Sequence, residues 1–279
     1  MFPLDGLRGI AILLVIAHNL GVPGDPVIDG FAVKLARMFV NAGWFGVQLF
    51  FVLSGFLITG FLLQENAPGI RPLSSSLRDF YIRRILRIFP LYYSTLFAAL
   101  VFFPFFGGHA KSLEGPLEYQ RWYWAFVSNW GYAWHDLGGS FAHFWSLAVE
   151  EQFYVVWPLL VLNLRLKNLK WLCVFIVIMA TLFRIFFTLH DPVLAVKGAY
   201  TFSVARFDAL AIGGLLAIIL RDPIAFSRLK PLIIPMLWCG CAYVIGVSVI
   251  CHNFGPVVPV VKSSDYLCLL NQTVAMLIS

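Results

Sequence analysis

The chain has 279 residues, of which 60% are hydrophobic and 12% are charged, and its formal net charge at pH 7 is +6. Soluble domains usually carry about 25% charged residues, so this composition excludes an ordinary soluble protein and indicates a polytopic membrane protein. The positive charge does not indicate a nucleic-acid partner, because most Lys and Arg residues fall in short loops, where the positive-inside rule explains them.

Apolar runs of membrane-spanning length recur along the whole chain. A helix needs about 20 apolar residues to cross a bilayer, and these runs lack the two-residue alternation of a barrel strand. We therefore predict an all-α fold, a polytopic transmembrane helix bundle of about eight spans. The spans are expected near residues 4–22, 44–63, 88–106, 143–164, 171–189, 203–220, 231–251 and 258–279.

The loops predict the orientation of the bundle. Lys and Arg are more frequent in the loops on the side of the N-terminus, which predicts a cytoplasmic N-terminus and a multi-pass protein of the inner (cell) membrane. The loop at 107–142 falls on the opposite side and is long and aromatic. Its segment RWYWAFVSNWGYAW, residues 121–134, suits an interfacial aromatic belt better than a span.

The first apolar run, LDGLRGIAILLVIAHN, contains two ionisable residues, Arg8 and His18. Such residues are costly within a span and are functional candidates there. On a helix they lie about 15 Å apart along the axis, so we expect different tasks. His18 can act as a general base or nucleophile, and Arg8 can bind a phosphate or carboxylate. The alternatives are a snorkelling anchor for Arg8 and a packed polar side chain for His18.

The segment RDFYIRRILRIFPLYY contains three closely spaced arginines. Arg83 and Arg87 share one helix face, and Arg84 lies next to them. At the inner surface such a cluster could bind the anionic end of a phosphorylated ligand. The alternative is a set of stop-transfer arginines attracted to anionic lipid.

The segment HFWSLAVEEQFYVVWP places two adjacent carboxylates, Glu150 and Glu151, in a predicted span. Burial of two ionised carboxylates is rarely a packing choice, because both must lose water. One carboxylate could orient or charge-stabilise an imidazole, and the other could pair with an arginine such as Arg184 or Arg206. The alternative is that both cap the start of the helix.

The segment ARFDALAIGGLLA is predicted to have a structural role. Arg206 and Asp208 flank a helix start and are expected to form a structural pair, and Gly213 and Gly214 permit close helix contact.

The chain has no GxSxG elbow, no P-loop, no HExxH motif and no metal-ligand spacing. We therefore expect no metal site and no bound cofactor.

Five blocks taken together resemble the acyltransferase-3 family of integral membrane acyltransferases: LDGLRGIAILLVIAHN, GVQLFFVLSGFLI, FYIRRILRIFPLYY, FWSLAVEEQFYVVWPLL and RFDALAIGGLLA. The resemblance implies one membrane acyltransferase-like domain over residues 1–279, which we expect to be incomplete at its C-terminus. It also implies transfer of an acyl group, typically acetyl, from cytoplasmic acyl-CoA as co-substrate. The acceptor would be a hydroxyl of a cell-envelope carbohydrate or a lipid-linked sugar.

The family's functional residues map onto the candidates above. The resemblance implies that His18 deprotonates the acceptor hydroxyl or itself accepts the acyl group. It implies that Glu150 or Glu151 fixes the tautomer of the imidazole and stabilises its cation. It further implies that arginines at the inner face hold the phosphates of CoA, namely Arg8, Arg83, Arg84 and Arg87.

The residues leave two other functions open. One is a transporter or exporter of an envelope precursor, in which Arg184, Glu150 and Glu151 form a proton or substrate path. The other is an inactive, truncated homologue. The expected partners are membrane lipid and the carbohydrate or lipid-linked acceptor, and nothing in the sequence predicts an oligomeric state.

Overall fold

The computed structural model describes residues 2–20, 43–65, 72–108, 110–135 and 140–231, with a few single positions between and after these ranges. Within them the secondary structure is helical and contains no strand, which confirms the predicted all-α class. The chain divides into two compact units. One consists of residues 1–57 with 209–279, and the other of residues 58–208.

The first unit contains α1 (Phe2–Leu20) and the beginning of α3 (Trp44–Glu65). These two helices are in close contact at Gly46. A Cβ atom added to Gly46 would lie 2.6 Å from the carbonyl oxygen of Ala11, a distance that no real Cβ tolerates. Glycine therefore lets the backbones of α1 and α3 approach each other directly, as small residues do in membrane helix pairs.

The same unit contains the end of α12 (Ser203–Ile219), which packs on α3 through two glycines. A Cβ atom on Gly55 would lie 1.9 Å from the Leu210 carbonyl oxygen, and one on Gly213 would lie 2.0 Å from the Val52 carbonyl oxygen. Each glycine thus accommodates the backbone of the other helix. This confirms the expectation of close helix contact at Gly213.

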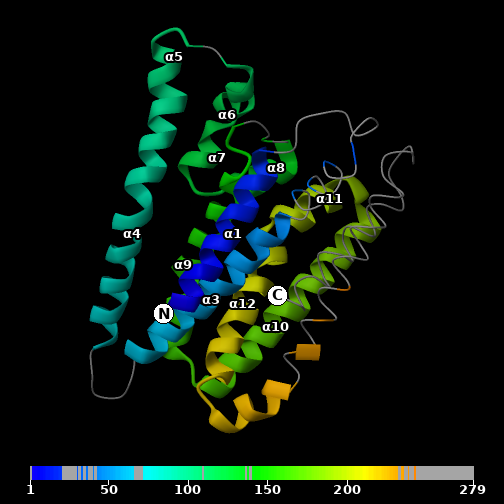
Figure 1. Ribbon diagram of the computed structural model, residues 1–279. Helices are drawn as coiled ribbons and strands as arrows, with labels where there is room; N and C mark the ends of the chain where they lie inside the picture. Colours follow the sequence, from blue (N-terminus) through cyan, green and yellow to red (C-terminus); the bar gives the residue numbers. More distant parts are fainter. Residues whose placement is uncertain are drawn as a thin grey trace. The chain divides into compact units, whose positions relative to one another are not determined.

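The second unit begins with the last part of α3, from Ile58, and continues with a long helix (Figure 1). The winding of this helix changes towards its far end. The helix α4 (Leu73–Phe97) continues into the π-helical segment η1 (Ala98–Phe102) and the single turn α5 (Phe103–Phe105). The helix therefore begins before the span predicted at 88–106. The basic first part of α4 is helical as well, and Pro90 lies inside the helix without ending it.

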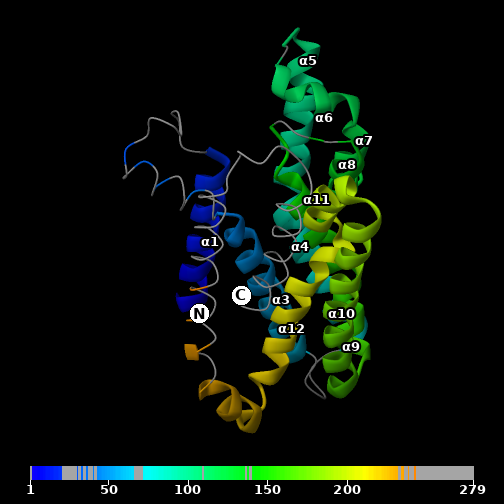
Figure 2. The same cartoon turned by 90° about the vertical axis from the view of Figure 1, so that its right-hand side faces the viewer.

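The helices α9 (Phe144–Asn163) and α10 (Leu166–His190) follow each other as an antiparallel pair (Figures 1 and 2). The shorter helix α11 (Pro192–Thr201) packs on α10 and also on α8 (Ser128–His135). The side chain of Asp191 caps α11, because it accepts a hydrogen bond from the backbone N–H of Leu194.

The aromatic segment between α5 and α9 consists of short helices. These are η2 (Lys111–Leu113), α6 (Glu114–Glu118), α7 (Gln120–Trp124) and α8. None is long enough to cross a bilayer, in agreement with the predicted interfacial character of residues 121–134.

An aromatic core joins this segment to α4. The rings of Tyr92 and Phe126 are stacked with centroids 3.9 Å apart, and the Tyr92 hydroxyl donates to the Tyr123 carbonyl oxygen at 2.8 Å. Burial raises the pKa of the Tyr123 hydroxyl, which therefore stays protonated. The core consists of Tyr92, Leu96, Leu100, Leu113, Tyr123, Phe126, Leu137, Phe141 and Phe144.

In the described part of the chain, four helical segments are long and apolar enough to cross a membrane, which supports a multi-pass membrane protein. The predicted runs at 4–22 and 143–164 are helical, as α1 and α9, but are not among these four; Glu150, Glu151 and Gln152 lower the hydropathy of α9. The runs at 231–251 and 258–279 lie outside the described ranges. The predicted count of about eight spans is thus not confirmed. The four segments are Phe45–Gln64, Ser74–Phe105, Leu166–His190 and Lys197–Ile219.

Candidate functional site

His18 lies in the last turn of α1, in the first unit, and is exposed. Its Nδ1 lies 3.0 Å from the carbonyl oxygen of Val40. A carbonyl oxygen only accepts hydrogen bonds, so the neutral ring must carry its proton on Nδ1. This leaves the Nε2 lone pair as the basic position, which is the arrangement that a general base needs.

The backbone next to His18 is tightly packed. A Cβ atom on Gly43 would lie 2.6 Å from the Cβ of His18 and 2.4 Å from the carbonyl oxygen of Leu14. Gly43 also donates its backbone N–H to the Val40 carbonyl oxygen at 3.0 Å. The carbonyl that orients the imidazole therefore also accepts a hydrogen bond from Gly43, a residue in contact with α1.

Arg8 lies near the other end of α1 and is partly buried. Its Nε is buried and makes no hydrogen bond to any residue in the described ranges. Because α1 is one unbroken helix, Arg8 and His18 lie about 15 Å apart along its axis and about 80° apart around it. The two side chains cannot bind the same small group, as the sequence predicted.

The three arginines of α4 have different surroundings within the second unit. Arg83 and Arg87 are exposed, and the guanidinium of Arg83 lies over the Phe61 ring, 4.9 Å from its centroid. Arg84 is partly buried and lies over the Tyr154 ring at 4.7 Å. Two of these side chains therefore reach solvent or lipid head groups, and one turns towards α9.

The acidic pair of α9 is also divided between two environments. Glu150 is buried, with 5% of its surface exposed, and Glu151 is only partly buried. The Glu151 carboxylate interacts electrostatically with Arg84 and with Glu150. Because Glu151 and Tyr154 are three residues apart, they share a helix face, and both interact with Arg84. We call Arg84, Glu151 and Tyr154 the α4–α9 cluster.

The structure thus brings together part of the predicted site. Within the second unit, one member of the basic block, Arg84, meets one member of the acidic block, Glu151. Arg8 and His18 belong to the first unit. The sequence places the basic and acidic blocks on separate helices but does not predict which of their members meet.

A buried ion pair links α10 to α12. The Arg184 guanidinium donates to the Asp208 carboxylate at 2.6 Å and to the Ala205 carbonyl oxygen at 2.6 Å, and the two charged side chains are 2% and 0% exposed. From the sequence we expected Asp208 to pair with Arg206 and did not predict its ion pair with Arg184. Asp208 lies 24 residues from Arg184 in the sequence, and only the packing of α10 on α12 brings them together.

Arg206 is fully buried among aromatic rings. Its guanidinium lies 4.4 Å from the centroid of the Tyr200 ring and 5.6 Å from that of Trp145, and its Nε donates to the Tyr200 carbonyl oxygen at 2.6 Å. The rings and the carbonyl both stabilise the cation. Arg206 thus ties the α11–α12 connection to α9.

Sequence reasoning missed a buried amide and hydroxyl network in the second unit. The Gln152 amide donates to Asn129 Oδ1 at 2.9 Å, the Asn129 amide donates to Ser203 Oγ at 2.9 Å, and Ser203 Oγ donates to Gln152 Oε1. The Trp130 indole also donates to Ser203, at 3.2 Å. The signal was a Gln directly after the two glutamates of a predicted span. The network fixes α9 at the position next to Glu151.

Gln48 is a second polar residue that was not singled out. It lies on α3 in the first unit and is fully buried. Its amide nitrogen and oxygen make no hydrogen bond within the described ranges. These ranges also contain no group of three or more His, Cys, Asp or Glu side chains that could hold a metal ion.

Comparison with known proteins gives one family and several relatives. A family model described as an acyltransferase domain, that of the acyltransferase-3 family, matches residues 3–279. A peptidoglycan O-acetyltransferase of Listeria monocytogenes is 32% identical over 246 residues, which cover 82% of this chain and 35% of the relative. The chain therefore spans about a third of that protein's length.

A Bacillus subtilis protein, whose name gives peptidoglycan O-acetyltransferase as a provisional assignment, is 35% identical over 165 residues. This alignment covers 56% of this chain and 23% of the relative. An uncharacterized protein of Haemophilus influenzae is 33% identical over 194 residues, 62% of this chain and 74% of that protein. No solved structure matches the chain.

Proposed function

Because this chain belongs to the acyltransferase-3 family, we propose that it is a membrane O-acyltransferase that moves an acetyl group from acetyl-CoA to a hydroxyl of a cell-envelope carbohydrate. The observation that carries the proposal is the contact of His18 Nδ1 with the Val40 carbonyl oxygen, which places the Nε2 lone pair in the position of the proton acceptor. The family match supplies the reaction class, and the imidazole supplies the base that the reaction requires.

The chemical step follows from this geometry. Nε2 of His18 takes the proton from the acceptor hydroxyl as the oxygen attacks the thioester carbonyl carbon. The new C–O bond forms and the C–S bond breaks, so that the acetyl group leaves the donor. The departing thiolate of CoA then takes the proton from the imidazolium, and His18 returns to its starting state.

The arginines are proposed to hold the donor on the cytoplasmic side. CoA carries phosphates, and guanidinium groups bind phosphates with paired, charge-assisted hydrogen bonds. Arg83 and Arg87 are exposed, which supports direct contact of these side chains with the phosphates. Arg84 is held by Glu151 and Tyr154, which supports a role in fixing this part of α4. Arg8 is proposed to bind the donor as well.

The glutamates are proposed to be required for transfer through their charge, because the Val40 carbonyl already fixes the tautomer of His18. Glu150 is the more deeply buried of the two and Glu151 faces Arg84, so the two are expected to respond differently to substitution. Glu150→Gln and Glu151→Gln keep the size of the side chain and remove the charge. A loss of transfer in both variants, with unchanged folding, would support a need for charge rather than shape.

The acceptor is proposed to be a peptidoglycan-type polysaccharide. The support is the name of the Listeria relative, which matches most of this chain. Peptidoglycan lies outside the cytoplasmic membrane, so this acceptor also requires the predicted cytoplasmic N-terminus and a transfer step towards the outer side.

The test uses membranes from cells that express this chain, supplied with acetyl-CoA labelled in the acetyl group. We expect label to enter purified envelope glycan, and mild base to release it as acetate, because an O-acetyl ester is base-labile. Vector membranes are the matched control. Label that enters glycan equally in both membranes would contradict the proposed function, and label that resists mild base would contradict ester formation.

A further inference from the structure

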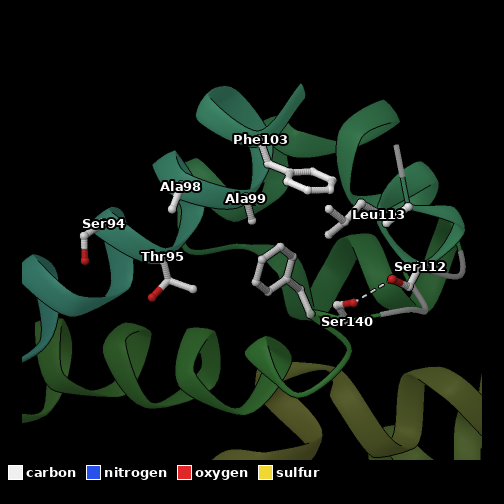
Figure 3. A pocket seen from close by; sticks show the side chains of 10 residues that line it. Ser94, Thr95, Ala98, Ala99, Phe103, Ser112, Leu113 and Ser140 are labelled. Atoms are coloured by element: carbon white, nitrogen blue, oxygen red, sulfur yellow. Dashed lines mark hydrogen bonds between the residues drawn. The ribbon is translucent and has the colours of Figure 1, made fainter. Parts of the chain in front are cut away.

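A pocket of about 800 Å³ lies at the far end of α4 in the second unit (Figure 3). Ser94 and Thr95 of α4 line one side together with Ala98 and Ala99, the first two residues of the π-helical segment η1. Single-turn π segments inside α-helices occur frequently at functional sites. The other lining residues are Phe103, Ala110, Ser112, Leu113, Ser140 and Phe141.

The hydroxyl groups of the pocket are largely used within the protein. Ser94 and Thr95 donate back to the Leu91 carbonyl oxygen at 3.1 and 2.7 Å. Ser140 donates to Ser112 at 2.9 Å, as Figure 3 shows. None of the described residues that line the pocket has a charged or amide side chain. A sugar would lose the hydrogen bonds that water gives its hydroxyls, whereas a hydrocarbon chain would lose none.

The walls of the pocket are fixed from both sides. A Cβ atom on Gly108 would lie 2.7 Å from the Phe103 ring, so the glycine leaves room for this ring in the wall. The opposite wall is fixed by two bonds between Ser112 and Ser140, one through the side chains and one from the Ser140 N–H to the Ser112 carbonyl oxygen at 3.1 Å. The cavity is therefore preformed, as ligand pockets usually are.

The surroundings of the pocket indicate what can enter it. The part of the long α4–η1–α5 helix that follows Arg87 is apolar, and only 17% of the most apolar window of the segment Ser74–Phe105 is buried in the protein. Leu91, Phe97 and Phe102 on this segment are 74%, 55% and 56% exposed. Arg87 is the last charged residue of this segment, and 16 residues, about 24 Å of helix, separate it from the lining residue Phe103, close to the thickness of the hydrocarbon core. The pocket therefore lies at one boundary of the bilayer core, next to lipid-facing surface.

We propose that this pocket binds one acyl chain of a membrane phospholipid. The apolar lining takes the chain, and the pocket's level on α4 matches the level at which phospholipid chains begin. Lys111 is exposed directly beside the lining residue Ser112, where its ammonium group can meet the lipid phosphate. This lipid site is independent of acyl transfer and does not require that the proposed function is correct.

The test uses the full chain in nanodiscs that contain phosphatidylcholine with a photoreactive diazirine on one acyl chain. After irradiation, peptides are mapped by mass spectrometry. We expect label at residues 94–103 and 110–113. Ala99→Trp fills the pocket and should remove most of this label. Val101→Trp is the matched control, because it places the same ring on the same π segment, outside the pocket lining, and should keep the label.

Each outcome decides the proposal. Equal labelling in Ala99→Trp and Val101→Trp, or label spread evenly over the lipid-facing residues of α4 and α10, would overturn it, because the lipid would then be ordinary bilayer lipid. Displacement of the label by an equimolar polyprenyl phosphate, but not by unlabelled phosphatidylcholine, would overturn the choice of a phospholipid. If Ala99→Trp does not fold, Ala98→Phe is measured in its place with the same expectation.

Discussion

Two charged regions of the second unit differ in how they reduce the free-energy cost of placing charged side chains in an apolar chain. Arg184 and Asp208 form a direct 2.6 Å pair with almost no exposed surface. The arginines of α4 are instead spread over rings and a partly buried carboxylate, and Arg83 and Arg87 stay exposed. In the first region the two charges are paired inside the protein. In the second region two guanidinium groups remain at the surface, where they can contact an anion.

This difference suggests how structure and function are divided in the molecule. A buried, directly paired charge contributes to folding, because removal of one partner leaves the other unpaired in an apolar interior. An exposed charge contributes little to stability but can bind an anion. We therefore expect substitutions in the two regions to separate stability from donor binding.

The largest effect on stability is expected for Asp208→Ala. This variant leaves the Arg184 guanidinium without its carboxylate partner in the interior, and we expect a loss of about 3–5 kcal/mol in the free energy of unfolding. Thermal unfolding in detergent, followed by gel filtration of the heated samples, measures the loss. Asp208→Asn keeps an acceptor oxygen and should lose less. A melting temperature of Asp208→Ala equal to that of the wild type would show that the pair does not hold α10 to α12.

A smaller loss is expected for Ser203→Ala. The change removes the hydroxyl that accepts from Asn129 and Trp130 and donates to Gln152. Buried partners left without a hydrogen bond cost about 1–3 kcal/mol, so the melting temperature should fall, but less than in Asp208→Ala. Ser227→Ala is the control, because that hydroxyl donates to a carbonyl of its own turn on an exposed helix. Equal melting temperatures of the two serine variants would contradict a structural role for the network.

Arg87→Ala is expected to act on the donor rather than on the fold. Loss of one charge-assisted contact to phosphate should raise the KM for acetyl-CoA about tenfold, with little change in kcat or in melting temperature. The effect should shrink with a donor analogue that lacks one of the phosphates of CoA. A lower kcat at unchanged KM would contradict the assignment of Arg87 to donor binding.

The smallest effect is expected for Arg78→Ala, which tests the same helix outside the basic block. Arg78 lies 3.4 Å from Asp79, and its side chain is 70% exposed. Exposed ion pairs contribute about 0–1 kcal/mol, so the melting temperature and the KM for acetyl-CoA should both stay near those of the wild type. A rise in KM as large as that of Arg87→Ala would mean that any arginine on α4 serves, and the basic block would lose its special role.

The sequence predicted helices correctly where an apolar run was long and contained few charged residues. The spans expected at 44–63, 171–189 and 203–220 correspond to α3, α10 and α12. At α4 the expected span began only after the basic residues, although their spacing placed Arg83 and Arg87 on one face of a helix. Arg and Leu are good helix formers, and the helix therefore continues through the basic part to Leu73.

The candidate site was predicted only in part, for a similar physical reason. The positions of Glu150 and Glu151 on one helix follow from the sequence, because helical spacing is a local property. The contact of Arg84 with Tyr154 and the pair of Arg184 with Asp208 join different helices. Spacing along the chain does not define which helices are neighbours, so these partners could only be found in three dimensions.

The most direct test of the central claim compares His18→Ala with Asn19→Ala in the labelled acetyl-CoA assay, at matched expression. Asn19 is the adjacent residue, and within the described part of the chain its amide donates to the Val15 carbonyl oxygen of its own helix. The account predicts that His18→Ala abolishes the transfer of label to envelope glycan and that Asn19→Ala retains it. Transfer by His18→Ala at the wild-type rate would contradict the claim that this imidazole performs the chemistry.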